Sequence, residues 1–123
     1  MSRDIGQKFV NYIVKDDFEA LSKLLDEEIV FTAATPGDTW HGEGIKNAMV
    51  ELRNFFSPDE AIEKIVTIEH NELPGRSRIS YKLQGREKEF GVFEYEHQAY
   101  FQTEDNKISQ LRILCSGLYT PEE

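Results

Sequence analysis

The stretch FEYEHQAYFQTEDNKISQLRILCSG, residues 93–117, predicts two long strands joined by a tight turn. Side chains of a strand alternate between its two faces, so the apolar positions before the turn share one face. That face carries Phe93, Tyr95, His97, Ala99 and Phe101. After the turn the same rule groups the apolar residues 111, 113 and 115 against the polar residues 110, 112 and 116. We therefore expect one inner wall that carries a histidine, a tyrosine and the chain's single cysteine.

The same period of two extends through the second half of the chain. Strands are expected at residues 62–73, 77–84, 89–103 and 107–116, joined by the turn-forming segments LPGR, QGREKE and TEDNK. Strands joined by short turns pair antiparallel, which predicts a meander. Tyr81 should face inward with Ile79 and Leu83, because these are the apolar positions of their strand.

The first half of the chain is mostly helical in its pattern. Apolar residues at helical spacing predict helices over residues 3–15 and 17–26. EEIVFTAA, residues 27–34, predicts a short strand, and TPGDT, residues 35–39, predicts a loop. A third helix should follow the glycines of WHGEG and end at Ser57-Pro58. The order predicts a single α+β domain over residues 1–123, with three N-terminal helices on one face of an antiparallel sheet.

Composition restricts the class of function. The 123 residues carry a net charge of -9 without a basic patch, which disfavours nucleic acid as a partner. No apolar run reaches the ~20 residues of a membrane span, and no secretory leader is visible. The single cysteine fits a reducing compartment, so we expect a cytoplasmic protein. The three histidines lack the spacing of a metal site, and no cofactor motif is present.

Three segments in this order, FEALSKLLDEEIVF (18–31), WHGEGIKNAM (40–49) and NKISQLRILCSG (106–117), resemble the nuclear transport factor 2-like superfamily and its SnoaL-like domains. The resemblance covers almost the whole chain. It implies a cone, in which a curved sheet wraps around the helices and encloses an apolar pocket. Members include ketosteroid isomerases, polyketide cyclases, scytalone dehydratase, limonene epoxide hydrolase and non-catalytic binding domains, so the fold does not decide the function.

The resemblance allows a check on isomerase chemistry. Ketosteroid isomerases use an aspartate base with a tyrosine and a protonated aspartate as the oxyanion hole. Matching DEEIVF to the family's first strand puts Ala33 or Thr32 at the position of the base, and Phe9 at the position of the tyrosine. The oxyanion aspartate falls on Gln98, or on His97 if the register shifts by one. Isomerase chemistry of this type is therefore disfavoured, and the two buried acids of an epoxide hydrolase relay are not evident either.

A dehydratase-like arrangement of histidine and tyrosine remains open. A neutral imidazole takes a proton near pH 7 and a tyrosine polarises a developing oxyanion, so His97, with Tyr95 and Tyr81 as partners, is the catalytic hypothesis. The alternative is a non-catalytic module that binds a small apolar molecule, or a domain that only associates. The expected pocket lining is Phe9, Tyr12, Phe31, Ala33, Trp40, Met49, Leu111, Ile113 and Cys115.

The resemblance also implies a homodimer. The outer face of the sheet near Val92, Tyr100 and Leu114 is the expected interface.

Overall fold

A computed structural model describes residues 2–56, 61–89, 91–117 and 119–120. Within these residues the chain forms three helices and six strands. In chain order they are α1 (Ser2–Val14), α2 (Phe18–Lys23), β1 (Leu25–Thr35), β2 (Asp38–Glu43), α3 (Ile45–Phe55), β3 (Ala61–Leu73), β4 (Arg76–Glu87), β5 (Gly91–Glu104) and β6 (Lys107–Cys115). The α+β class and the helices before the meander are confirmed.

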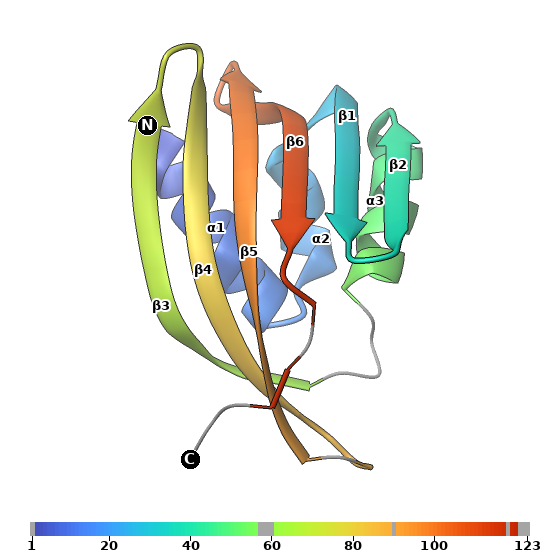
Figure 1. The fold of residues 1–123 in the computed structure, drawn as a ribbon. Coiled ribbons are helices and arrows are strands. Elements are labelled where there is room, and N and C mark those ends of the chain that lie inside the picture. Colours follow the sequence, from blue (N-terminus) through green and yellow to red (C-terminus); the bar gives the residue numbers. More distant parts are fainter. Residues whose placement is uncertain (1, 57–60, 90, 118, 121–123) are drawn as a thin grey trace.

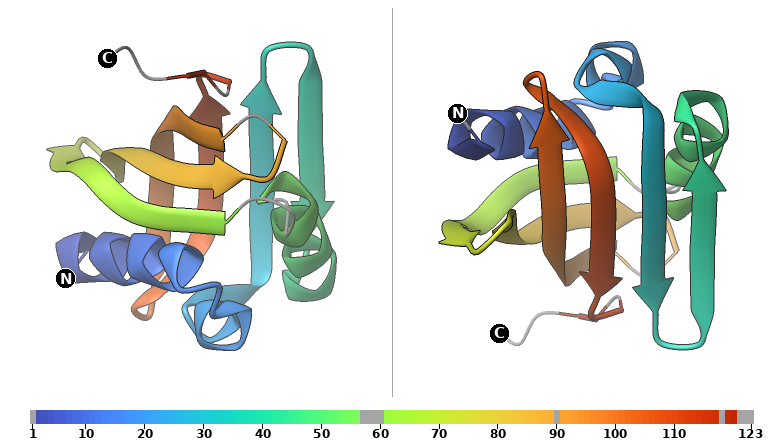
Figure 2. Two further views of the ribbon diagram at one scale, coloured as in Figure 1. Left: turned by 90° about the horizontal axis from the view of Figure 1, so that it is seen from below. Right: turned by 90° about the horizontal axis from the view of Figure 1, so that it is seen from above.

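The six strands form one open sheet with the order β2-β1-β6-β5-β4-β3. The meander from β3 to β6 is antiparallel, as predicted, and β1 pairs with β6 in parallel. The helices lie together on one face of the sheet (Figure 1), and the long strands curve strongly (Figure 2). Two irregularities in the pairing of β3, after Ile62 and after Ile65, fit this curvature, because a bulge bends and twists a strand.

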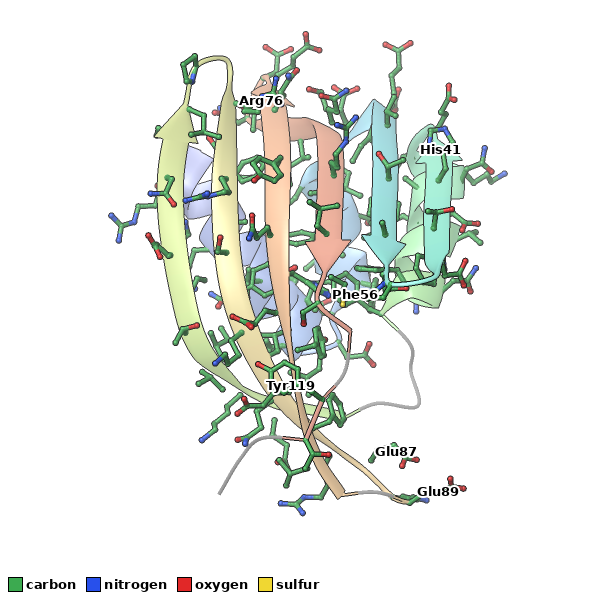
Figure 3. All side chains as sticks on the ribbon, viewed as in Figure 1. His41, Phe56, Arg76, Glu87, Glu89 and Tyr119 are labelled. Carbon is green, nitrogen blue, oxygen red and sulfur yellow. The ribbon has the colours of Figure 1, made fainter. Side chains whose placement is uncertain are left out.

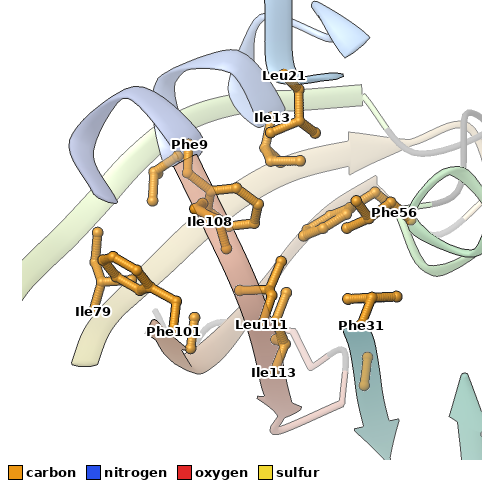
Figure 4. Packing of buried hydrophobic residues seen from close by; sticks show 14 of the residues in the cluster. Phe9, Ile13, Leu21, Phe31, Phe56, Ile79, Phe101, Ile108, Leu111 and Ile113 are labelled. Atoms are coloured by element: carbon orange, nitrogen blue, oxygen red, sulfur yellow. The ribbon is translucent and has the colours of Figure 1, made fainter. Parts of the chain in front are cut away.

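The hydrophobic core lies between the helices and the inner face of the sheet. Alternation along β5 buries Phe93, Tyr95, His97, Ala99 and Phe101, as the sequence predicts. Figure 4 shows helical residues Phe9, Ile13 and Leu21 across from strand residues of the core. Burial of aromatic and aliphatic side chains on this scale is the main stabilising contribution to such a domain.

The turn between β5 and β6 is also confirmed. Glu104 pairs with Lys107, which leaves Asp105 and Asn106 as a two-residue loop. Both loop residues have positive φ, 51° and 64°. This is the conformation of a type I′ hairpin turn, which asparagine and aspartate tolerate.

The first half of the chain requires three corrections. The predicted loop 35–39 is a tight turn at Pro36-Gly37 that leads into β2, a strand missing from the predicted order. The second helix covers only Phe18–Lys23 instead of 17–26. The first strand accordingly begins at Leu25, because Leu25 already pairs with Ile108 of β6. The predicted end of the third helix at Ser57-Pro58 lies outside the described residues.

The glycines of WHGEG have a role in packing as well as in starting a helix. Gly42 pairs with Phe31 inside β2. A Cβ atom on Gly42 would lie 2.8 Å from the carbonyl oxygen of Asn47 and 3.0 Å from the Cα of Ala48. The absence of a side chain thus lets β2 and the first turn of α3 approach closely.

Candidate functional site

An open pocket of about 610 Å³ lies where the β1–β2 turn, the end of α3 and the end of β6 meet. Figure 3 shows Phe56 near the end of β6 at this place. Aromatic residues form much of the wall, and the lining consists of Thr35, Pro36, Trp40, Asn54, Phe55, Phe56, Tyr95, His97, Cys115, Ser116 and Gly117. None of these is an acid, a lysine or an arginine.

His97 lies at the inner end of this pocket, on β5. Only 3% of the residue is exposed. The ring of Phe55 stacks on the imidazole with 5.1 Å between centroids, and the ring of Phe56 lies at 5.4 Å. On the strand side, the ring centroids of Tyr95 and Tyr81 lie 4.7 Å and 5.2 Å from the centroid of the imidazole. The imidazole therefore lies in an aromatic enclosure that has little water.

One hydrogen bond orients the imidazole within this enclosure. Tyr81 Oη lies 2.9 Å from His97 Nδ1, because the two residues face each other across the β4–β5 pair. Burial lowers the pKa of His97 from its usual 6.5 to about 3. Burial, with smaller contributions from Tyr95 and Cys115, raises the pKa of Tyr81 well above its usual range. Both side chains are neutral at pH 7.

These protonation states constrain the chemistry of the site. An imidazole with a pKa of about 3 is a weak proton acceptor at neutral pH, so the predicted use of His97 as a base has little driving force. As a neutral hydrogen-bonding group it remains effective. Among the described residues, no group of three or more histidines, cysteines, aspartates or glutamates is arranged to hold a metal ion.

The structure brings the three predicted catalytic residues together. Tyr81, Tyr95 and His97 are all buried on the inner face and contact one another around the imidazole ring. Of the predicted lining residues, Trp40 and Cys115 lie on the pocket wall. The ring of Trp40 also packs edge to face on Phe55, with centroids 5.1 Å apart.

The other predicted lining residues lie elsewhere in the interior. They are packed into or against the core and do not form the wall of this pocket: Phe9, Tyr12, Phe31, Ala33, Met49, Leu111 and Ile113. The helices fill the space next to them. Their contact with a ligand stays a prediction.

Two of the most important wall residues were missed. Phe55 and Phe56 both pack on His97, and neither is among the lining residues expected from the sequence. The signal was the pair of adjacent aromatics at the end of an amphipathic helix. Phe55 is the last residue of α3, and Phe56 leaves the helical conformation with φ -95° and ψ 81°, so both adjacent rings reach His97.

The structure shows where the residues at the ketosteroid isomerase positions lie. Ala33 faces inward and is buried, and Thr32 on the same strand faces the opposite side. Phe9 is buried in the core. His97 faces inward and Gln98 is exposed, so His97 is the residue at the oxyanion position. None of the inward-facing side chains at these positions is a carboxylate.

No protein-family model matches the chain, and no curated protein matches its sequence. Solved structures do match. An isomerase candidate from Bacillus subtilis has a TM-score of 0.79 at 17% identity over 92% of this chain and 84% of that one. An NTF2-like protein of unknown function from Cytophaga hutchinsonii has a TM-score of 0.66 at 19% identity, with coverages of 94% and 90%. A polyketide cyclase candidate from Xanthomonas campestris has a TM-score of 0.70 at 15% identity, with coverages of 91% and 87%.

These likenesses confirm the expected fold. The chain has the nuclear transport factor 2-like architecture, a curved sheet on one side and helices on the other, with a pocket at one end. At 15–19% identity they establish the fold only, so the function follows from the site.

Proposed function

We propose that the protein binds a small, neutral and largely apolar molecule in the pocket at His97. The observation that carries the proposal is the aromatic enclosure of an uncharged imidazole at the inner end of an open pocket. Ligand sites are typically concave and apolar with few polar groups that fix orientation, and this pocket has that composition.

The lining also indicates which ligands are disfavoured. A charged group that enters this pocket would lose hydration, and the lining offers no opposite charge in return. A flat, apolar ligand would instead pack against Trp40, Phe55 and Tyr95. Aromatic pairs add about 0.5–1.5 kcal/mol beyond the burial of their surfaces.

Removal of Phe55 is expected to weaken binding about tenfold, because its ring forms part of the wall and holds Trp40 and His97 in place. The protein has a single tryptophan, so one indole signal in a two-dimensional ¹H–¹⁵N NMR spectrum reports on the pocket. Titration with 2-ethylnaphthalene should shift this signal to saturation, and Phe55→Ala should displace the titration curve to higher concentration.

Val50→Ala is the matched control for this experiment. Val50 lies on the same helix, is 55% exposed and is not part of this pocket. Its substitution should leave the titration unchanged. An indole signal that does not respond to apolar ligands in the native protein would reject the proposed function.

A second function is favoured by one specific feature, the buried Tyr81–His97 pair. A neutral imidazole can polarise a substrate carbonyl, as an electrophile rather than a base. Such a protein would catalyse an isomerisation, dehydration or cyclisation with His97 and Tyr95 in contact with the reacting group and Tyr81 orienting the imidazole. Conversion of a bound molecule over time by the native protein, and not by His97→Gln, would establish this activity.

The resemblance also leads us to propose a homodimer through the outer face of the sheet. Leu114 is 48% exposed there, at a row where β4, β5 and β6 carry the uncharged residues Ser80, Gln98 and Leu114. A groove of about 450 Å³ crosses the same row. Glu69 and Glu96 also line this groove. An exposed leucine with polar residues around it is compatible with burial at the centre of an interface with a second copy.

Leu114→Arg is expected to convert this dimer into a monomer, because two arginines would meet near the centre of a two-fold interface. Size-exclusion chromatography with light scattering measures the mass. Val50→Arg, on the helix side of the sheet, introduces the same charge at another exposed apolar residue and should remain dimeric. A native protein that is monomeric at high concentration would refute the dimer.

A further inference from the structure

The protons of the Tyr81–His97 pair can be assigned from the available acceptors. Tyr81 is 2% exposed, and among the described residues the acceptor within reach of its hydroxyl is His97 Nδ1, at 2.9 Å. If Nδ1 carried the proton and donated it to Tyr81, the buried phenolic proton would have no acceptor. A buried polar group without a partner costs about 1–3 kcal/mol. The phenol therefore donates to Nδ1, and the imidazole proton is on Nε2.

The second imidazole nitrogen is thus a hydrogen-bond donor. His97 Nε2 has no hydrogen-bond partner among the residues that the structure describes, but it is not sealed inside the protein. Arg78 Nε is the single side-chain nitrogen or oxygen in the described part of the chain that is both fully buried and unpartnered. The two nitrogens of an imidazole point in widely different directions, so with Nδ1 directed at Tyr81 on β4, Nε2 is directed away from β4. The pocket lining from Trp40, Phe55 and Cys115 lies on that other side.

The surroundings of His97 keep this donor neutral. The groups that pack around the ring are Phe55 and Phe56 from α3, Tyr81 from β4 and Tyr95 from β5. Cys115 is across the β5–β6 pair. No carboxylate, lysine or arginine is among these described neighbours. At the ring of His97 the packed neighbours are aromatic, while the other polar side chains of the lining are Thr35, Trp40, Asn54, Tyr95 and Ser116. The Nε2–H group is therefore a neutral donor at the aromatic end of the pocket.

We propose that the ligand of this pocket carries a carbonyl-type oxygen that accepts a hydrogen bond from His97 Nε2, with Tyr81 fixing the tautomer that makes this possible. The inference rests on the proposed function and specifies its ligand class as neutral ketones, aldehydes, esters or lactones on an apolar body. His97 selects the oxygen, and Tyr81 is a positioning residue that acts through His97.

A series of ligands with one shared body tests the proposal. The probes are 2-acetylnaphthalene, which has a ketone oxygen, 2-ethylnaphthalene, which lacks it, and 2-naphthoate, which is charged. Binding is measured from the Trp40 indole signal. We expect the ketone to bind about fivefold more tightly than the hydrocarbon, the ratio that one net hydrogen bond provides. The carboxylate should bind more weakly than the ketone.

The variant His97→Phe keeps an aromatic ring at this position and removes the donor. Whatever its affinity for 2-ethylnaphthalene, this variant should bind the ketone and the hydrocarbon with equal affinity. If the native protein binds both neutral probes equally, the carbonyl inference is wrong while the proposed function stands. If it binds none of the three probes, the proposed function itself fails.

The role of Tyr81 has a separate readout. In ¹⁵N-labelled protein, imidazole nitrogen shifts at pH 7 should show a protonated Nε2 and an unprotonated, hydrogen-bonded Nδ1 at His97. Tyr81→Phe should move the ring toward a mixture of tautomers and reduce the ketone preference. Native protein with Nδ1 protonated would overturn the assignment, whatever the variants do.

Discussion

Acidification from pH 7 to pH 4 is expected to remove about 3 kcal/mol of stability from this protein through His97 alone. Burial lowers the pKa of His97 to about 3 in the folded protein, against 6.5 for the exposed residue. Below pH 6.5 the unfolded chain binds a proton that the folded protein excludes, so stability falls with pH until about pH 3. Above pH 6.5 His97 is neutral in both the folded and the unfolded state, so its contribution to the free energy of unfolding no longer changes with pH.

Denaturant unfolding at a series of pH values measures this effect, with His97→Phe as the control. Carboxylates also titrate between pH 4 and pH 7, but they contribute to both proteins. The variant should therefore show a shallower loss of stability on acidification, and the difference between the two curves isolates the histidine. Parallel curves would mean that His97 titrates normally, and the aromatic enclosure would then be open to water.

Replacement of Gly42 by alanine is expected to destabilise the protein by about 3 kcal/mol, with a Tm lower by about 10 °C. The added Cβ would lie 2.8 Å and 2.9 Å from the carbonyl oxygen and carbon of Asn47. Both are backbone atoms in the first turn of α3, so no side-chain rotation relieves the overlap. The strand and the helix must separate, and the contacts of Ala48 in the core are lost with them.

Gly6→Ala provides the contrasting case. Its Cβ would meet the ends of the Ile79 and Phe101 side chains at 3.2 Å and 3.3 Å. These side chains can shift by a few tenths of an ångström, and alanine gains about 1 kcal/mol over glycine inside a helix. Thermal unfolding should give Gly6→Ala a Tm close to that of the native protein and Gly42→Ala a much lower Tm. Equal effects of the two substitutions would show that the close approach at Gly42 is unimportant.

The sequence predicts the meander well because alternation along long strands is a strong signal. β5 shows this most clearly, where residues 93–101 divide into inner and outer faces as expected. β2 was missed because it is six residues long, contains Gly42 and follows a proline. Its pairing with β1 depends on tertiary contacts with α3, which no local pattern contains.

The sequence predicts the histidine and tyrosines of the candidate site, but it does not predict the aromatic residues that enclose the histidine. Tyr81, Tyr95 and His97 follow from strand alternation, and the antiparallel register brings Tyr81 opposite His97. The position of Phe55 and Phe56 depends on how α3 packs across the sheet. The unusual pKa of His97 depends on that packing as well, because an imidazole beside the same strand residues but open to water would titrate near its usual value.

The parallel pair of β1 and β6 has a consequence for folding. Phe31 pairs with Leu111, so the two partners come from opposite ends of the sequence. Pairing between distant segments is slow, on the order of milliseconds to seconds. During synthesis at ~5–20 residues per second, the segment through α3 waits roughly 3–12 s for the residues of β6. In that interval Phe31 and Ala33 can pair with β2 but lack β6 on their other side. Protection of the nascent chain from aggregation therefore depends on how long this edge of β1 remains without β6.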